Sequence, residues 1–260
     1  MNAELLIMFT LDCDRAYLYA HPERELTADE IARYDETLAR RSTGMPAQYI
    51  TGHQEFWGMD LIVSPAVLIP RPETEHVVEA VLELVAGGVP SQCLVDVGTG
   101  SGAIALALAS EMKAAEIHAT DISVAALEVA RANAARHELS SRVEFHEADL
   151  LAGLGMGKFD FVVSNPPYVG ESEEESVQLE VRKFEPRNAV FGGPSGLEVI
   201  ERLIPQAHEA LRPGGWLVME ISGTIADGVR KLLAGWSEVE VKNDLQGIDR
   251  VAMARKTAKG

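Results

Sequence analysis

A strand that runs directly into a glycine-rich turn constrains this chain more than any other feature. The segment from Leu94 to Gly102 reads LVDVGTGSG, and an alanine-rich stretch of helical length follows it. Glycine permits the backbone angles of a tight strand-to-helix turn, and the first turn of the helix offers free N–H groups to a ligand. The segment is therefore typical of the first strand–turn–helix unit of a nucleotide-binding α/β sheet.

Strands and helices alternate from this unit to the C-terminus. We predict strands over residues 93–97, 117–120, 143–146, 159–164, 216–221, 239–241 and 250–254, and helices over 103–110, 124–137, 197–211 (kinked at Pro205) and 225–233. Such alternation is typical of a doubly wound, mostly parallel sheet, here of seven strands. The last two strands have a short connection, which predicts an antiparallel pair at one edge.

Residues 1–52 have a helical pattern and differ from the rest of the chain. Thr27 and Glu30 have the spacing of a capping box, and apolar residues recur at helical spacing after them. Two short apolar stretches after residue 52 predict a β-hairpin that leads into a proline-rich loop. We predict three parts: a helical domain over 1–52, a hairpin linker over 53–72 and an α/β domain over 73–260 that opens with a helix over 74–86.

Composition excludes several classes of protein. The formal net charge of −17 disfavours a protein that coats nucleic acid, because such binding needs many Lys and Arg residues. No apolar run reaches the length of a membrane span, and the first residues lack the basic start of a signal peptide. Two distant cysteines are no disulfide framework, so we expect a cytoplasmic protein. The seven histidines are scattered without a ligand motif, so we expect no metal site.

The glycine turn has the character of a ligand site. Gly98 and Gly100 allow close approach of a ligand, and Asp121 follows at the spacing that places a carboxylate on ribose hydroxyls. These features fit a dinucleotide or S-adenosylmethionine, and a turn without a ligand is the plainer alternative. Asp96 favours S-adenosylmethionine, because a carboxylate inside the turn would repel a pyrophosphate and attract a sulfonium or ammonium group.

A second motif, Asn165-Pro166-Pro167-Tyr168, directly follows the apolar strand over 159–164. Ligands of open α/β sheets bind outside the carboxyl ends of the strands, so this motif should lie beside the glycine turn. The two prolines remove N–H donors and leave the Asn165 side-chain oxygen and the Pro166 carbonyl as acceptors for a flat NH2 group. Tyr168 could stack on the planar system that carries that group, although a proline turn that ends a strand is the alternative.

Several segments together resemble the HemK/PrmC family of peptide chain release factor N5-glutamine methyltransferases. They are IPRPETE (69–75), LVDVGTGSGAIALALA (94–109), VVSNPPY (162–168), FEPRNAVFGGPSGLEVI (184–200), LRPGGWLVMEI (211–221) and DLQGIDRVAMAR (244–255), and PAQYITGHQEFWG (46–58) fits the family's linker and hairpin. The likeness covers nearly the whole chain. It implies a Rossmann-like methyltransferase sheet, S-adenosylmethionine as cofactor and release factors as protein substrates, with no direct binding of nucleic acid and no membrane association.

The resemblance also implies roles for residues. The turn formed by Asp96, Val97, Gly98, Thr99 and Gly100 would hold the methionine part of the cofactor, and Asp121 the ribose. Asp149 and Leu150 would flank the adenine. Asn165 and the Pro166 carbonyl, in the motif that Pro167 and Tyr168 complete, would hold the glutamine amide. The loop with Arg71, Glu73 and Thr74 either closes over the cofactor or serves as a rigid linker. The helical domain, shorter than is usual in the family, would dock the substrate.

Two other functions remain alternatives at this point. A nucleic-acid amino methyltransferase of the adenine N6 type would share the NPPY motif, but the charge of −17 weighs against it. A dinucleotide-binding oxidoreductase, or a nucleotide-binding module without catalytic activity, would keep the glycine turn but would have no need of NPPY.

Overall fold

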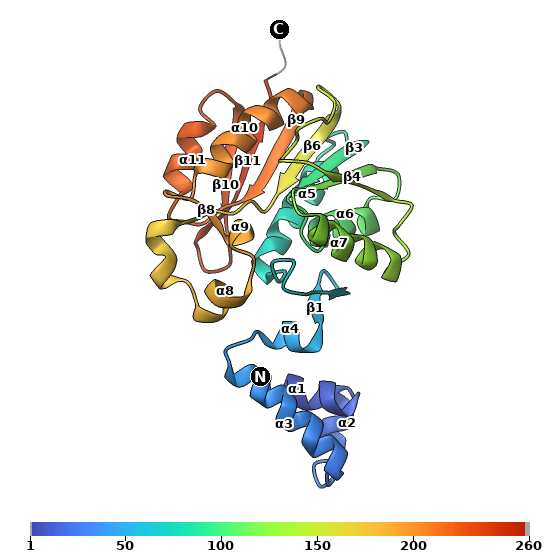
Figure 1. The fold of residues 1–260 in the computed structure, drawn as a ribbon. Helices are drawn as coiled ribbons and strands as arrows, with labels where there is room; N and C mark the ends of the chain where they lie inside the picture. Colours follow the sequence, from blue (N-terminus) through green and yellow to red (C-terminus); the bar gives the residue numbers. More distant parts are fainter. Residues whose placement is uncertain (1, 258–260) are drawn as a thin grey trace.

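A seven-stranded sheet in the order β10-β11-β9-β6-β3-β4-β5 forms the centre of the computed structural model, which describes residues 2–257 (Figure 1). The strands are β3 (Cys93–Val97), β4 (Glu116–Asp121), β5 (Val143–Glu147), β6 (Phe159–Ser164), β9 (Leu211–Glu220), β10 (Ser237–Asn243) and β11 (Asp249–Arg255). Neighbours from β9 to β5 pair in parallel, whereas β11 pairs antiparallel with both β9 and β10. The predicted doubly wound sheet with an antiparallel edge is confirmed.

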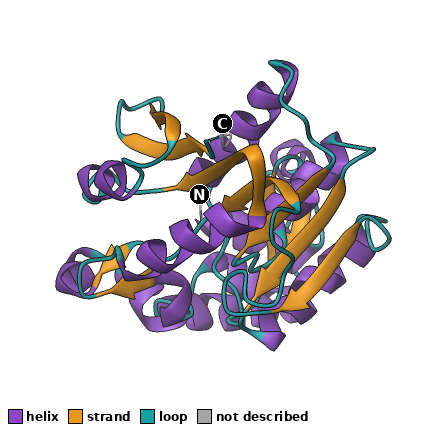
Figure 2. Cartoon of the chain, turned by 90° about the horizontal axis from the view of Figure 1, so that it is seen from above, coloured by secondary structure: helices purple, strands orange, loops and turns teal. Residues whose placement is uncertain are grey.

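Helices cover both faces of the sheet (Figure 2). One face packs against α5 (Glu75–Ala86), α6 (Ala103–Glu111) and α7 (Val124–Arg136), and the other against α10 (Glu198–Ala210) and α11 (Ala226–Leu232). Successive strand residues alternate between these layers, so that Leu94 joins the first apolar core and Val95 the second. Because both faces are buried, the central strands β3 and β6 are mostly apolar, with one buried acid each, Asp96 and Asp160.

Four α-helices of the described residues precede the hairpin: α1 (Asn2–Leu11), α2 (Arg15–Ala20), α3 (Ala28–Ser42) and α4 (Ala47–Thr51). The predicted capping box at the start of α3 is present, with Thr27 and Glu30 each accepting the other's backbone N–H. Leu6 of α1 packs against Ala47 and Ile50 of α4 in a small core of its own. In Figure 1 these helices lie apart from the sheet, at the lower end of the view.

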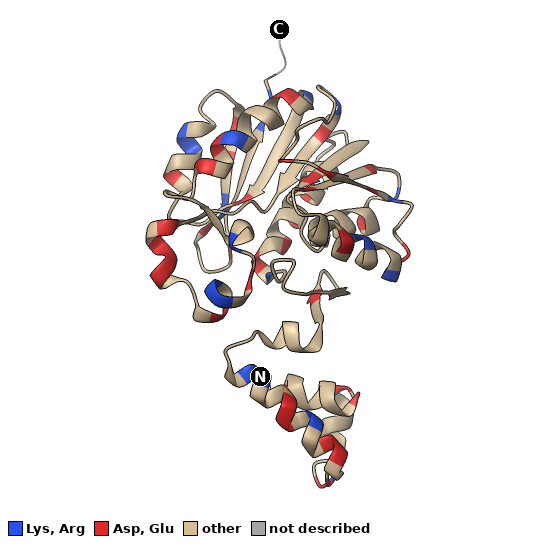
Figure 3. Ribbon diagram, in the orientation of Figure 1, with Lys and Arg blue, Asp and Glu red and all other residues tan. Residues whose placement is uncertain are grey.

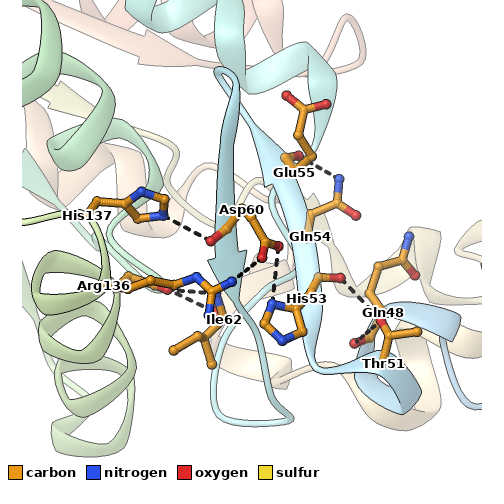
Figure 4. Close-up of polar contacts among 10 residues, drawn as sticks. Gln48, Thr51, His53, Gln54, Glu55, Asp60, Ile62, Arg136 and His137 are labelled. Atoms are coloured by element: carbon orange, nitrogen blue, oxygen red, sulfur yellow. Dashed lines mark hydrogen bonds and ion pairs between the residues drawn. The ribbon is translucent and has the colours of Figure 1, made fainter. Parts of the chain in front are cut away.

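The predicted hairpin is also confirmed, as β1 (His53–Phe56) and β2 (Met59–Ile62). Trp57 and Gly58 between them have φ angles of 53° and 69°, which suit the right-handed twist of a two-residue hairpin turn. Asp60 on β2 accepts hydrogen bonds from Arg136 at the end of α7, and its backbone oxygen faces His137 (Figure 4). The hairpin is thereby fixed against the first layer of helices.

Some elements differ from the prediction. Strand β9 begins at Leu211 rather than Trp216, because Leu211 pairs with Phe159 of β6, and Gly214 and Gly215 exchange backbone hydrogen bonds with Lys256. Pro205 lies inside α10 without ending it. Residues 171–176 form a 3-10 helix, η2 (Glu171–Ser176), that is absent from the predicted elements.

Sequence patterns also missed several other short elements. These are η1 (Pro72–Thr74), the paired strands β7 (Val169–Gly170) and β8 (Phe191–Gly193), and the helices α8 (Leu179–Phe184) and α9 (Arg187–Val190). Among residues 2–257, no helix combines the length and the apolar character that crossing a membrane requires.

Candidate active site

A cavity of about 530 Å³ opens at the carboxyl ends of β3, β4, β5 and β6. This is the edge at which open α/β sheets bind ligands, and the volume suits a small molecule. The predicted site residues that line the cavity are Gly98, Thr99, Gly100, Asp121, Asp149, Leu150, Asn165 and Pro167. The predicted residues outside its lining are Asp96, Val97, Pro166 and Tyr168.

The glycine turn is held by its own backbone and by β4. The N–H groups of Gly98 and Thr99 both donate to the Thr120 carbonyl, at 2.9 Å. Gly98 and Gly100 have φ angles of 72° and 55°, a region that side chains with a Cβ rarely adopt. Nothing lies within 4 Å of where a Cβ would stand on either glycine, so the turn faces open space on the cavity side.

Asp121 lies at the end of β4, beside the turn. One carboxylate oxygen accepts the Gly100 N–H and the other the Ser123 N–H, both at 2.9 Å. Burial raises the pKa of this carboxyl, and the backbone donors oppose that shift. Each oxygen keeps lone pairs for a further donor, so Asp121 can accept from hydroxyl groups of a ligand in the cavity.

Asp96 lies beneath the turn rather than on the cavity wall. Its side chain is only 1% exposed, and one oxygen accepts from the Thr99 hydroxyl at 2.6 Å and the Ala105 N–H at 3.2 Å. The other oxygen has no hydrogen-bond partner among the described residues. Burial raises the pKa of Asp96 to about 7. An unpartnered carboxylate oxygen under the turn suits a cationic ligand group.

The far end of the cavity combines one acid with apolar walls. Asp149 forms an ion pair with Arg202 of α10, and both side chains line the cavity. Leu150 has a φ angle of 56°, which turns the chain sharply after Asp149. Ile122 also lines the cavity although it is 60% exposed, and sequence reasoning missed it. An exposed apolar side chain beside an acid can pack on a flat heterocycle whose amino group the acid accepts.

The NPPY motif contacts a loop almost a hundred residues earlier. The Asn165 amide nitrogen donates to the Thr74 hydroxyl at 3.0 Å, so the amide oxygen is the end left for the cavity. Pro166 is buried. The Tyr168 hydroxyl donates to Glu220 at 2.8 Å, and its ring packs against the core around α10 instead of facing the cavity. The stacking expected of Tyr168 therefore has no counterpart in this arrangement.

Glu220 connects the contact of Asn165 with Thr74 to the contact of Tyr168, because it accepts from both the Thr74 and the Tyr168 hydroxyls. It ends β9, is 1% exposed, and also accepts from the Thr74 hydroxyl at 2.6 Å. Burial raises the pKa of its carboxyl, and Arg250 opposes that shift. Sequence reasoning gave Glu220 no role, although a lone acid at the end of an apolar strand was a usable signal.

Two further segments enclose the cavity. Residues 65–68 with Pro70, and the α9–β8 region with Asn188 and Phe191, contribute walls. Glu185, 5% exposed, joins these segments, because it accepts the Ile69 N–H and pairs with Arg71. Arg71 is thus bound to Glu185 and does not line the cavity.

Histidines 118 and 146 are less scattered than the sequence suggested. His118 Nδ1 lies 2.9 Å from His146 Nε2, and Glu144 is close to both rings. The Lys158 ammonium lies 2.8 Å from His118 Nε2 and 3.2 Å from Glu116. Because an ammonium group already supplies positive charge here, we assign no metal to this cluster, and none of its residues lines the cavity.

Charge is intermixed over the molecule. Figure 3 shows acidic positions along the helical segment, η2 and the sheet domain, with basic positions interspersed. This distribution agrees with the net charge of −17.

Comparison with known proteins finds relatives whose names state an activity. Residues 1–52 match the PrmC N-terminal domain and residues 78–183 the Methyltransferase small domain. The chain is 58% identical to the release factor glutamine methyltransferase of Koribacter versatilis, over 98% of this chain and 91% of that protein. It is 43% identical to the protein of that name from Moorella thermoacetica, over 98% of this chain and 90% of the relative. The solved hMettl16 catalytic domain, in complex with a MAT2A 3'UTR hairpin, matches with a TM-score of 0.61 at 19% identity, over 82% of this chain and 81% of that one, which shows a shared fold alone.

Proposed function

Because the chain belongs to the family of release factor glutamine methyltransferases, we propose that it methylates the side-chain amide nitrogen of a glutamine in a peptide chain release factor, the glutamine of the GGQ motif, with S-adenosylmethionine as methyl donor. The observation that carries the proposal is the Asn165 amide, which the bond to Thr74 turns so that its oxygen is left for the cavity beside the glycine turn.

The cavity residues fit S-adenosylmethionine. Asp96 lies beneath the turn and outside the cavity lining, so its carboxylate favours the ammonium of the methionine part through its charge, and the open backbone of Gly98 and Gly100 leaves room for that group. Asp121 can accept from ribose hydroxyls, and Asp149 with the apolar side chains beside it can hold the adenine. When bound, the cofactor supplies a methyl group on a sulfonium centre.

The task left to the protein is to position a poor nucleophile. The lone pair of an amide nitrogen is delocalised into the carbonyl. The Asn165 oxygen and the Pro166 carbonyl would accept the two N–H bonds of the glutamine amide and so fix the direction of its nitrogen. The same acceptors stabilise positive charge that develops on that nitrogen during transfer. Neither a histidine nor a carboxylate pair is needed as a general base.

The helical segment over residues 1–52 would bind the protein substrate. Several large apolar side chains are exposed on it, among them Phe9, Tyr19 and Ile31, at 46%, 70% and 47%. Exposed aromatic and aliphatic residues are common at protein interfaces. In this division of labour, residues 53–72 link the two parts and residues 73–260 perform the chemistry. Release factors act in the cytoplasm, which is where we place the protein.

One experiment separates this proposal from methylation of nucleic acid. The protein is incubated with labelled S-adenosylmethionine and either an intact release factor or DNA and RNA, and label is measured in each. We expect label only in the release factor, and none when its target glutamine is replaced by alanine. Label in nucleic acid alone would support the adenine N6 alternative.

A further inference from the structure

The geometry points to Glu220 as the residue that determines which end of the Asn165 amide faces the substrate, acting through the Thr74 hydroxyl. Glu220 is a positioning residue, since it touches neither substrate nor cofactor. The inference rests on the proposed function, because it assumes that the Asn165 oxygen accepts from the target amide.

The relay follows from the number of hydrogens available. A threonine hydroxyl has one hydrogen to donate. Thr74 directs that hydrogen to Glu220, at 2.6 Å, so toward Asn165 its oxygen can only accept. The group of Asn165 that lies 3.0 Å from it must therefore be the NH2 end. The amide oxygen is then directed away from Thr74, where it can accept from a ligand.

The second oxygen of Glu220 is also occupied. It accepts from the Tyr168 hydroxyl at 2.8 Å, so both carboxylate oxygens act as acceptors. This arrangement requires an ionised carboxylate. A protonated Glu220 would have to donate its hydrogen to the hydroxyl of Thr74 or of Tyr168. If the Thr74 oxygen accepted it, the Thr74 hydroxyl would point its own hydrogen at Asn165. The Asn165 oxygen would then turn toward Thr74, and its NH2 group would meet the NH2 group of the substrate.

The surroundings of Glu220 decide how firmly it stays ionised. Its side chain is 1% exposed, and burial works against the charge. The Arg250 guanidinium, from β11, favours the charged form, whereas Glu73, from η1, disfavours it. The Thr74 and Tyr168 hydroxyls stabilise the charged form by donating to it. Three groups, the Arg250 guanidinium and the Thr74 and Tyr168 hydroxyls, thus hold one carboxylate in the state that the relay needs.

Matched variants test the relay. Glu220→Gln replaces one acceptor oxygen by a donor, and Thr74→Val removes the hydroxyl, whereas Thr74→Ser retains it. We expect the first two to lower kcat for release factor methylation by roughly 10-fold or more, the loss expected from one misdirected polar contact to a developing charge. Thr74→Ser should keep most of the activity, and S-adenosylhomocysteine should bind all variants with nearly unchanged Kd. Tyr168→Phe leaves the Thr74–Glu220 bond in place and should lower kcat less than Thr74→Val.

Two readouts distinguish the relay from a merely structural role. The double variant Glu220→Gln/Thr74→Val should be no slower than the slower single variant, because both changes break one chain of contacts. In the wild-type protein, protonation of Glu220 should lower kcat at acid pH, because the relay needs the carboxylate. This fall of kcat toward acid pH should disappear in Thr74→Val, which has no hydroxyl to connect Glu220 with Asn165. If Glu220→Gln does not fold, as judged by circular dichroism, the contrast between Thr74→Val and Thr74→Ser decides instead.

Several results would overturn the inference. These are a fully active Glu220→Gln or Thr74→Val enzyme, losses that multiply in the double variant, and a Thr74→Ser enzyme as slow as Thr74→Val. Failure of the proposed function looks different: the wild-type protein would bind S-adenosylhomocysteine and methylate no release factor. An active wild-type enzyme with a fully active Glu220→Gln variant would contradict the relay alone.

Discussion

Asn133 on α7 holds both backbone groups of Ile62 on β2. Its side-chain oxygen accepts the Ile62 N–H at 2.6 Å, and its nitrogen donates to the Ile62 carbonyl at 3.0 Å. The same nitrogen donates to the Ser101 carbonyl in the glycine turn at 2.9 Å, and the side chain is fully buried. One amide therefore ties the linking hairpin to the turn that we propose holds the cofactor.

Replacing this amide should destabilise the protein strongly. Asn133→Leu leaves the Ile62 N–H and two carbonyls without their partner, and each unsatisfied buried group costs about 1–3 kcal/mol. Since three groups lose their partner, we expect the free energy of unfolding in urea to fall by about 3 kcal/mol or more. The control is Asp60→Ala on the same strand, which removes half-exposed ion pairs (Figure 4) and should cost no more than about 1 kcal/mol. Equal losses in the two variants would contradict the role given to Asn133.

Asp121 should contribute to cofactor affinity. Asp121→Ala removes the acceptor for the ribose hydroxyls and should weaken binding of S-adenosylhomocysteine by about 1–3 kcal/mol, the range for hydrogen bonds to a charged group. Isothermal titration calorimetry measures the change. Glu147→Ala, at the exposed end of the neighbouring strand β5, should leave the Kd unchanged. An unaltered Kd in Asp121→Ala would remove this residue from the site.

Binding of S-adenosylhomocysteine should depend on pH through Asp96. Burial raises the pKa of this carboxyl to about 7, so below that pH its proton must leave before the carboxylate can attract the ligand's ammonium. The Kd should therefore fall as pH rises from 6 toward 8, by up to about 10-fold per pH unit on the acid side. Asp96→Asn should bind more weakly and with little pH dependence. Asp121, whose pKa burial also raises, remains in both proteins, so any pH dependence that survives in Asp96→Asn is assigned to Asp121. Identical pH profiles would contradict the prediction.

The helical segment should affect the protein substrate and not the cofactor. Removal of residues 1–43 takes away α1 to α3 and leaves α4, whose Tyr49 packs against Val67 in the segment that follows the hairpin and donates to its carbonyl. We expect KM for an intact release factor to rise while the Kd for S-adenosylhomocysteine stays the same. A shortened protein that folds but no longer binds S-adenosylhomocysteine would show that the proposed division of the chain is wrong.

Sequence patterns predicted the elements whose signals are local. Strands β3 and β6 have the predicted limits, because continuous apolar runs end there at a glycine turn and at a proline pair. The start of β9 was missed, since Arg212 to Gly215 have the composition of a turn and become a strand only by pairing with distant segments. The short strands β7 and β8 were missed for the same reason.

In the candidate site, too, the features that follow from local sequence could be predicted and the long-range contacts could not. The glycine turn, Asp121 and Asn165 follow strands directly, so their place at one sheet edge could be predicted from the order of elements. Contacts between distant segments could not. Glu220 meets Thr74 across 146 residues, and Glu185 meets Ile69 across 116. The side chains of Asp96 and Tyr168 contact Thr99 and Glu220 and do not line the cavity, which the order of elements could not indicate.

The most direct test of the account is the rate of methyl transfer to the target glutamine of an intact release factor by Asn165 variants. We predict that Asn165→Ala binds S-adenosylhomocysteine like the wild-type protein and transfers methyl groups roughly 10²–10³-fold more slowly, the loss seen when one preorganised contact to a developing charge is removed. Asn165→Asp keeps an acceptor oxygen but cannot donate to Thr74, so it separates the two contacts of this amide. It should retain more activity than Asn165→Ala if acceptance alone matters, and as little if the bond to Thr74 is also required. Full activity of Asn165→Ala on the release factor would contradict the account, because the NPPY motif would then have no part in the reaction.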